Sequence, residues 1–352
     1  FAKLRHENRA KRYAFLKIMK IGINVLLNVT FFVLIPFMQK NFGILPGFNP
    51  YDVRYVFIAN LVATIVTLLF LIPELYPGHL YVNLKWSKQM FVYATPLVIA
   101  GFAGMINESL DRVLLKHFID VPAGIADAKN YVQAQIGIYG ANYKLAIFMT
   151  LFIQTFRYAA EPFIFSHYKN ENARELYAVI MKLFVITGLL IFLGITMYID
   201  VFKYFIGKDF YEGLRIVPIL LVANLFLGVN YNIGFWYKLR EKTQYGALIS
   251  ITGAVITVLF NIWLIPHLGY MGAAWATLIC YSSMMILNFF IGRKFYYVPY
   301  DLKWLSIYFF IALAFFLLAD NFFNTGEIFS YVIRTLFILT FVFIVFFKER
   351  TL

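Results

Sequence analysis

Apolar runs long enough to cross a bilayer dominate the chain. A transmembrane helix needs about 20 mainly apolar residues, and runs of that kind occur at ten places in the 352 residues. Transmembrane β-strands would be shorter and would alternate apolar with polar residues. The sequence therefore predicts an all-α integral membrane protein, with spans near 14–38, 53–72, 91–116, 132–163, 176–199, 213–236, 246–265, 271–291, 303–320 and 328–347.

Charge is scarce and unevenly distributed. The chain is 62% hydrophobic and 14% charged, whereas soluble domains are about half apolar and a quarter charged. Its formal charge of +13 comes largely from alternate connectors, for example Lys85 with Lys88 and Arg293 with Lys294. The positive-inside rule predicts that these connectors and both ends of the chain are cytoplasmic. The basic residues therefore indicate topology and contact with membrane lipids, and no nucleic-acid partner is expected.

Motifs of soluble catalysis and metal binding are missing from the sequence. There is no Gly-rich phosphate loop, no GxSxG and no metal-ligand spacing, and Cys280 is the single cysteine. The connectors are too short to hold a soluble active site. We expect no catalytic residue, no metal and no cofactor, and we do not expect an enzyme.

The span 91–116 contains Asn107-Glu108-Ser109-Leu110-Asp111-Arg112. A single charged group at the bilayer centre costs roughly 2.5–3.5 kcal/mol on insertion scales. One interpretation is a neutralised Glu108–Arg112 pair at i,i+4 near the interface, with Asp111 reaching water. The other is a polar patch that lines a cavity, in which Glu108 and Asp111 exchange a proton or a sodium ion.

The next span, 132–163, carries more polar residues. Lys144 lies ~18 Å from the outer end of the span, too deep to reach the surface easily. It needs a partner, either Glu108 or Asp111 or an anionic group of a substrate. Arg157 and Glu161, at i,i+4, are expected to form an ion pair near the cytoplasmic end, and Pro162 is expected to kink or end the helix.

Other polar residues in the spans have simpler explanations. Arg334 is expected to extend to the outer surface beside it. Single amides are expected to form hydrogen bonds between helices, at Asn24, Asn28, Asn60, Asn224, Asn230, Asn232, Asn261 and Asn288.

Four stretches of the chain carry a family resemblance. They are 96–101 leading into 107–112, 137–145 (GIYGANYKL), 156–162 (FRYAAEP), and 261–266 with 269–277. With these stretches the chain resembles the Wzx-type oligosaccharide flippases of Bacteroidetes-like bacteria, polysaccharide exporters of the multidrug/oligosaccharidyl-lipid/polysaccharide superfamily.

The resemblance implies a domain plan. Such proteins have twelve or fourteen helices in two six-helix lobes, and the longer members add a C-terminal pair. On that plan residues 1–89 are two helices from the end of the first lobe, 90–292 the second lobe and 293–352 the C-terminal pair. Four N-terminal helices would then precede Phe1, so we expect the chain to be part of a longer protein.

The resemblance also implies a function. The protein would move undecaprenyl-pyrophosphate-linked oligosaccharide across the bacterial inner membrane by alternating access, for polysaccharide or lipopolysaccharide O-antigen synthesis. The substrate contacts would be Lys144, Arg112, Asn142, Tyr139 and Arg157, and the proton- or sodium-coupling residues Glu108, Asp111 and Glu161. A multidrug or cation exporter of the same superfamily, or a membrane-embedded polysaccharide polymerase or ligase, are the alternatives.

Overall fold

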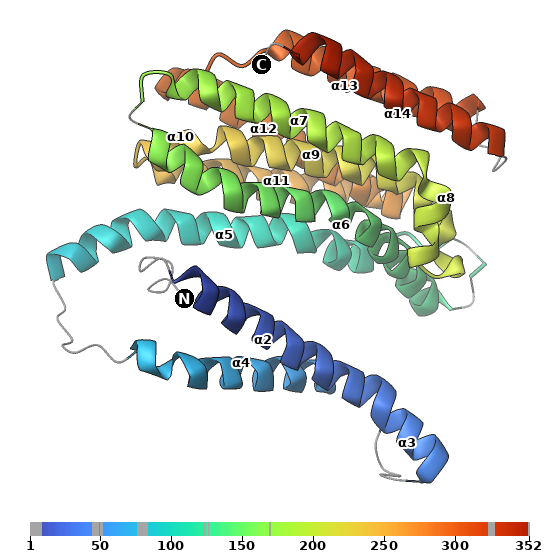
Figure 1. Ribbon diagram of the computed structural model, residues 1–352. Coiled ribbons are helices and arrows are strands. Elements are labelled where there is room, and N and C mark those ends of the chain that lie inside the picture. The colour runs from blue at the N-terminus through green and yellow to red at the C-terminus, as the bar shows by residue number, and fades with distance from the viewer. Residues whose placement is uncertain are drawn as a thin grey trace. The chain divides into compact units, whose positions relative to one another are not determined.

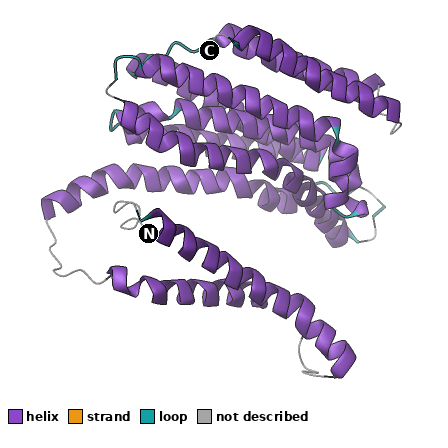
Figure 2. Cartoon of the chain, viewed as in Figure 1, coloured by secondary structure: helices purple, strands orange, loops and turns teal. Residues whose placement is uncertain are grey.

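The computed structural model of the chain is helical throughout. It describes residues 9–43, 49, 52–75, 84–122, 124–125, 127–168, 170–322 and 328–350. Within these ranges there is no strand (Figure 2). Ten of the described helices are long and apolar enough to cross a membrane. The prediction of an all-α, multi-pass membrane protein is confirmed.

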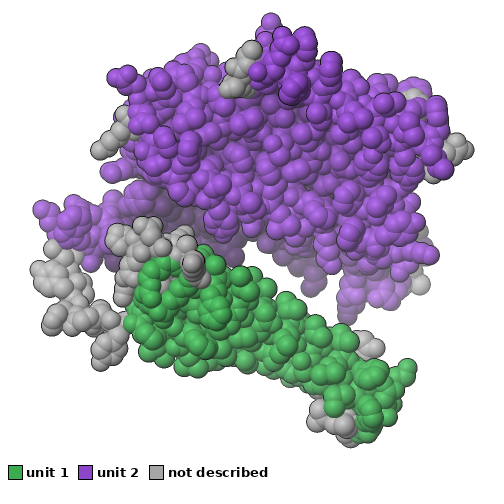
Figure 3. All heavy atoms as spheres, viewed as in Figure 1, with its two compact units in different colours: residues 1–84 green, residues 85–352 purple. Residues whose placement is uncertain are grey.

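The chain forms two compact units, Phe1–Leu84 and Lys85–Leu352 (Figure 3). The domain boundaries expected after residues 89 and 292 stay predictions.

The first unit is a pair of helical segments packed side by side. Its elements are α2 (Ala10–Val29), a π-helical turn (Thr30–Leu34), α3 (Ile35–Phe42) and α4 (Arg54–Leu75). The π-helical turn comes just before Pro36. Proline has no backbone N–H and its ring clashes with the carbonyl four residues earlier, so a locally widened turn is a usual accommodation.

The second unit contains the other eight spans (Figure 1). Its helices are α5 (Leu84–Phe118), α6 (Ala128–His167), α7 (Ala173–Met197), α8 (Ile199–Phe202), α9 (Val217–Ile233), α10 (Phe235–Leu239), α11 (Thr243–Leu268), α12 (Tyr270–Phe295), α13 (Leu302–Phe322) and α14 (Ile328–Glu349), with 3₁₀ segments at Lys203–Phe205 and Lys208–Ile216. Pro162 does not end α6, which continues to His167.

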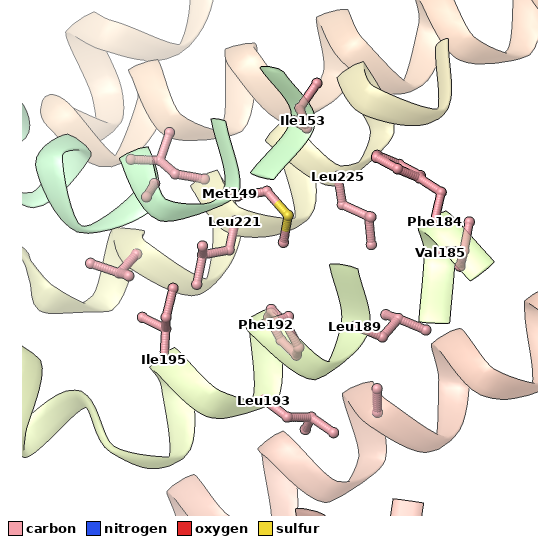
Figure 4. Close-up of a cluster of buried hydrophobic side chains, with 14 of the residues drawn as sticks. Met149, Ile153, Phe184, Val185, Leu189, Phe192, Leu193, Ile195, Leu221 and Leu225 are labelled. Atoms are coloured by element: carbon pink, nitrogen blue, oxygen red, sulfur yellow. The ribbon is translucent and has the colours of Figure 1, made fainter. Parts of the chain in front are cut away.

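Helix α9 is the centre of this unit. It packs against α6, α7 and α12, while α11 packs against α12, and α13 and α14 pack against α7. Figure 4 shows the apolar contact of α6, α7 and α9, where Met149 and Ile153 meet Phe184 and Leu225. The span that includes α9 is the most buried of the ten, so its apolar residues form a protein core rather than a lipid-facing surface.

Ion pairs fasten α14 to the α7 region at one end. Arg334 is 2% exposed and donates hydrogen bonds to Asp200 Oδ2 and to the Met197 carbonyl, both at 3.0 Å. Lys203 Nζ contacts the other Asp200 oxygen at 3.1 Å. The expectation that Arg334 extends to the outer surface is wrong, because a carboxylate and a carbonyl at the end of α7 are already within its reach.

A second set of polar contacts fastens the other end of α14. Lys182 of α7 contacts Glu349 at 3.1 Å and Asp301 at 3.5 Å. The Tyr308 hydroxyl of α13 donates to the other Glu349 oxygen at 2.7 Å. Helix α14 is therefore tied to the α7 region near both of its ends.

We predict that Gly228→Ala destabilises the second unit. A Cβ atom on Gly228 would collide with the Phe184 ring and lie 2.9 Å from Ile153 Cγ1, and both side chains are buried. Overpacking of this kind costs about 1–3 kcal/mol, which would appear as a lower thermal midpoint in detergent. Gly194→Ala in α7 is the control, since nothing lies within 4 Å of its Cβ. Equal midpoints for the two variants would contradict the close packing.

We also predict acid-sensitive stability at Asp200. Burial opposes its ionisation, but hydrogen bonds from Arg334 and Lys203 outweigh burial and lower the pKa of the Asp200 carboxyl. This stabilisation is complete above the unfolded pKa of ~3.9 and is lost as pH falls through the lower folded value.

Asp200→Asn tests that assignment. At neutral pH it removes the charged hydrogen bonds that Asp200 accepts from Arg334 and Lys203 and is expected to cost about 2 kcal/mol. The variant should also lose part of the dependence of the unfolding midpoint on pH below ~4. Asp209→Asn changes an exposed acid and is the control. A D200N midpoint with the acid dependence of the parent would show that Asp200 is not the group responsible.

Candidate functional site

A carboxylate is buried where four helices of the second unit meet. Asp111 of α5 is 1% exposed. Its Oδ2 accepts hydrogen bonds from the Tyr139 hydroxyl of α6 at 2.7 Å and the Thr277 hydroxyl of α12 at 2.9 Å. Its Oδ1 accepts one from Asn261 Nδ2 of α11 at 3.1 Å. Asp111 does not reach water, as one interpretation expected, because three donors replace water around it.

A second layer of hydrogen bonds joins α5 to α11 one turn away. Asn107 Oδ1 accepts from the Thr257 hydroxyl at 3.2 Å, so Asn107 and Asp111, at i,i+4, face Thr257 and Asn261, also at i,i+4. Gly253, one turn before Thr257, permits this approach, since a Cβ there would lie 3.0 Å from Asn107 Nδ2.

Helix α5 is attached to the unit by few residues. Its buried residues form one stripe with a spacing of four and comprise Ala103, Asn107, Asp111 and Leu115. Half of that stripe is polar. The position of α5 therefore depends heavily on the hydrogen bonds of Asn107 and Asp111.

A cavity of about 290 Å³ opens beside Asn107. We call it the Glu108–Arg157 hollow, after the two charged side chains among its lining residues. Arg157 is half-buried, and its guanidinium lies over the Tyr231 ring, 4.3 Å from the centroid. Tyr281, another lining residue, is 1% exposed, and its hydroxyl has no hydrogen-bond partner in the described part of the chain. The hollow is therefore lined by a carboxylate and a guanidinium, with the buried Tyr281 hydroxyl in its wall.

Two amides form a rigid part of the wall. Asn288 Nδ2 donates to both the backbone carbonyl and Oδ1 of Asn230 at 2.9 Å, and Asn288 Oδ1 accepts from Trp236 Nε1 at 2.9 Å. With Asn261, these bonds confirm the expected role of amides between helices. The expectation is wrong for Asn24 and Asn28, which bond each other within α2, for Asn60, which accepts from Thr64 within α4, and for Asn232, which donates to Gly228 within α9. Asn224 Nδ2 has no hydrogen-bond partner among the described residues.

The expected Glu108–Arg112 pair does not form in the described residues. Glu108 is exposed and lines the hollow. Arg112 lies over the Tyr143 ring of α6, 5.1 Å from its centroid. An aromatic face on the neighbouring helix replaces the carboxylate on its own helix as the partner of this cation.

The expected Arg157–Glu161 pair is also wrong. Glu161 forms an ion pair with Lys238 of α10 at 2.6 Å, and Arg157 uses the Tyr231 ring instead. Both charges find partners on other helices, so Glu161 is neutralised while Arg157 remains available to the hollow.

Lys144 lies apart from this site. It is exposed and, from helix geometry, projects about 140° around α6 from Arg157. It has no hydrogen bond or ion pair with Glu108 or Asp111 in the described structure, because the Asp111 oxygens already accept three bonds. Asn142 is fully buried and donates to the carbonyls of Ile138 and Phe210 at 2.8 Å, so it anchors the 3₁₀ segment Lys208–Ile216.

Sequence reasoning missed several residues of the site. Thr257 and Thr277 complete the Asp111 network, and Tyr231 and Tyr281 line the hollow. A signal was present in α11, where small and polar residues recur every four positions at Gly253, Thr257 and Asn261. Such a row is typical of a close, hydrogen-bonded helix contact in a membrane.

The described part of the chain contains no group of three or more His, Cys, Asp or Glu side chains that could hold a metal ion.

No protein-family model, curated protein or solved structure matches the chain. The geometry of the site and the resemblance of the four sequence stretches are therefore the basis for a proposed function.

We predict that Asp111→Asn destabilises the unit by about 2 kcal/mol. Three donors converge on the two carboxylate oxygens, so an amide would turn its NH₂ group toward at least one donor and leave it unsatisfied. Thermal unfolding in detergent measures the loss. Glu108→Gln is the matched control, an exposed acid on the same helix whose substitution should leave the midpoint unchanged. A midpoint that falls equally in both variants would argue against Asp111 as the helix-joining group.

Proposed function

We propose that the protein is a flippase that moves undecaprenyl-pyrophosphate-linked oligosaccharide from the inner to the outer leaflet of a bacterial inner membrane. The observation that carries the proposal is the Glu108–Arg157 hollow, a charged and hydrogen-bonding cavity between membrane-spanning helices. A sugar-phosphate head cannot cross ~30 Å of hydrocarbon unaided, whereas its lipid tail can stay in the bilayer.

The residue types of the hollow suit a glycan. Tyr231 and Tyr237, both partly exposed, line it with aromatic faces and hydroxyl groups, and Glu108 and Arg157 add a hydrogen-bond acceptor and donors. Sugars present a dense array of hydroxyl groups that such side chains can bind. An apolar cavity would leave those hydroxyl groups without hydrogen-bond partners.

Basic side chains are the proposed contacts of the pyrophosphate group. Arg157 in the hollow can form two parallel hydrogen bonds with a phosphate group. Lys144 is an exposed ammonium on another face of α6 and would meet the head group in a different position. Arg112, half-buried over Tyr143, lies one turn after Glu108.

Asp111 and Glu108 are the proposed coupling acids. Glu108 can exchange a proton or a sodium ion with the hollow, and Asn107 lines the hollow while accepting a hydrogen bond from Thr257, one turn along α11 from Asn261. A change at Asp111 would alter the hydrogen bonds that hold α5. Proton or sodium exchange would then be coupled to transport through the hydrogen bonds that attach α5 to the unit. Glu161, paired with Lys238, has the weaker claim.

The proposed orientation rests on the charges of the connectors. The basic connectors would face the cytoplasm, with both ends of the chain on that side. The substrate would enter from the leaflet in which lipid-linked sugars are assembled.

An exporter of organic cations is the second candidate. Glu108 lies in the hollow with three tyrosines, and a carboxylate with aromatic faces also suits a cation. Export of this kind would require Glu108 and would not require Lys144.

The test is Lys144→Ala in cells that depend on this gene product. We expect lipid-linked oligosaccharide to accumulate and surface polysaccharide to fall about tenfold or more, because the pyrophosphate loses a cation at membrane depth. Extracted lipid intermediates and surface glycan are the measurements. Arg157→Gln should act in the same direction.

Lys129→Ala, an exposed lysine near the start of α6, is the control and should behave as the parent. If Lys144→Ala and Arg157→Gln leave both glycan measurements unchanged while Glu108→Gln abolishes efflux of organic cations, the exporter is the better assignment.

A further inference from the structure

Two guanidinium groups converge on one buried tyrosine at an end of the second unit. Arg174 and Arg240 lie over the Tyr296 ring, 5.3 Å and 5.6 Å from its centroid. Tyr296 is 8% exposed, whereas both arginines are exposed. Among the described residues neither arginine forms an ion pair with a carboxylate, and Arg174 also hydrogen-bonds the Tyr296 side chain, which leaves the other guanidinium N–H groups for a ligand.

The three residues come from different elements. Arg174 is in the first turn of α7, Arg240 lies between α10 and α11, and Tyr296 directly follows α12. The ends of three spans therefore meet at the Tyr296 ring. The connectors involved are among those that the charge pattern predicts to be cytoplasmic.

A cavity of about 340 Å³ lies at this convergence. We call it the Tyr296 hollow. It contains both signs of charge, because Glu171 and Glu175 line it together with Arg174 and Arg240. The remaining lining residues are Tyr168, Asn170, Ala173 and Tyr296.

The depth of the Tyr296 hollow matches that of lipid head groups. Helix α7 has 25 residues and is therefore ~37 Å long. The hydrocarbon core is about 30 Å thick and the bilayer with its head groups about 40–45 Å. A helix of this length extends past the hydrocarbon core, so its end and the hollow beside it would fall within the head-group layer.

The tyrosine holds the arginines in place without neutralising them. Burial raises the pKa of the Tyr296 phenol, and the two guanidinium groups oppose that rise. A neutral ring can stack against a guanidinium and leave its N–H groups pointing outward. Those N–H groups have the geometry that binds phosphate in pairs.

We propose that the Tyr296 hollow binds the phosphoethanolamine head group of a membrane phospholipid, with Arg174 and Arg240 on the phosphate and Glu171 and Glu175 on the ammonium. A purely anionic head group would meet two uncompensated carboxylates. A choline head group has a cation but no N–H to donate to them. The assignment is independent of which cargo the protein transports, because no residue of the Glu108–Arg157 hollow takes part.

The experiment is calorimetric titration of the full chain in detergent with short-chain lipids. Dioctanoyl phosphatidylethanolamine should bind at least about threefold more tightly than the phosphatidylcholine or phosphatidylglycerol of the same chain length. The double variant Arg174→Ala/Arg240→Ala should weaken its binding about tenfold. Glu171→Gln/Glu175→Gln should remove the preference over phosphatidylglycerol while phosphate binding persists.

Arg293→Ala is the matched control, an exposed arginine over the neighbouring Tyr297 ring at 5.7 Å, and should bind as the parent does. Gel filtration and the thermal midpoint verify that each variant is folded. Equal binding of the three lipids, or unchanged binding by the double arginine variant, overturns the proposal. Soluble O-phosphoethanolamine binding as tightly as the lipid would also overturn it, since the ligand would then be a free phosphate ester.

Discussion

The hydrogen-bonded burial of Asp111 organises the second unit. Lipid tails compete with helices for apolar contact, so apolar area alone does little to specify which helices associate in a bilayer. A carboxylate at depth is different, because it requires donors and only particular helices carry them. Asp111 receives one donor from each of α6, α11 and α12, and these bonds fix α5 next to the hollow that its own Glu108 lines.

Much of the architecture could be predicted from the chain alone. Long apolar runs in a bilayer leave helices as the natural solution, since a helix satisfies its backbone groups internally, and all ten expected spans are helical. The polar cluster at 107–112 can also be identified from the sequence as a part that needs protein around it. Its partners Tyr139, Asn261 and Thr277 cannot be identified in this way, because they lie far away along the sequence and a single threonine in a span gives little signal.

The two ion pairs that do not form share one physical cause. Same-helix pairs at i,i+4 are visible in a sequence, so the sequence offers Arg112 as one possible partner of Glu108 and Arg157 as the partner of Glu161. In the structure both arginines stack on tyrosines of other helices and Glu161 pairs with Lys238. Isolated i,i+4 pairs contribute only about 0.2–0.5 kcal/mol, less than a cation–π contact removed from water can provide. Cross-helix partners therefore prevail wherever packing supplies them.

The stripe by which α5 is attached restricts how that helix can move. Because its buried positions recur every four residues, a screw displacement by one residue would turn the stripe by 100° and separate every polar pair at once. A slide of four residues, ~6 Å along the axis, would restore a buried stripe and bring Asn107 to the place of Asp111. Shifts of α5 by whole multiples of four residues are therefore favoured over smaller ones. Two neighbouring registers would differ in the residue between the helices, which is the acid Asp111 in one and the amide Asn107 in the other.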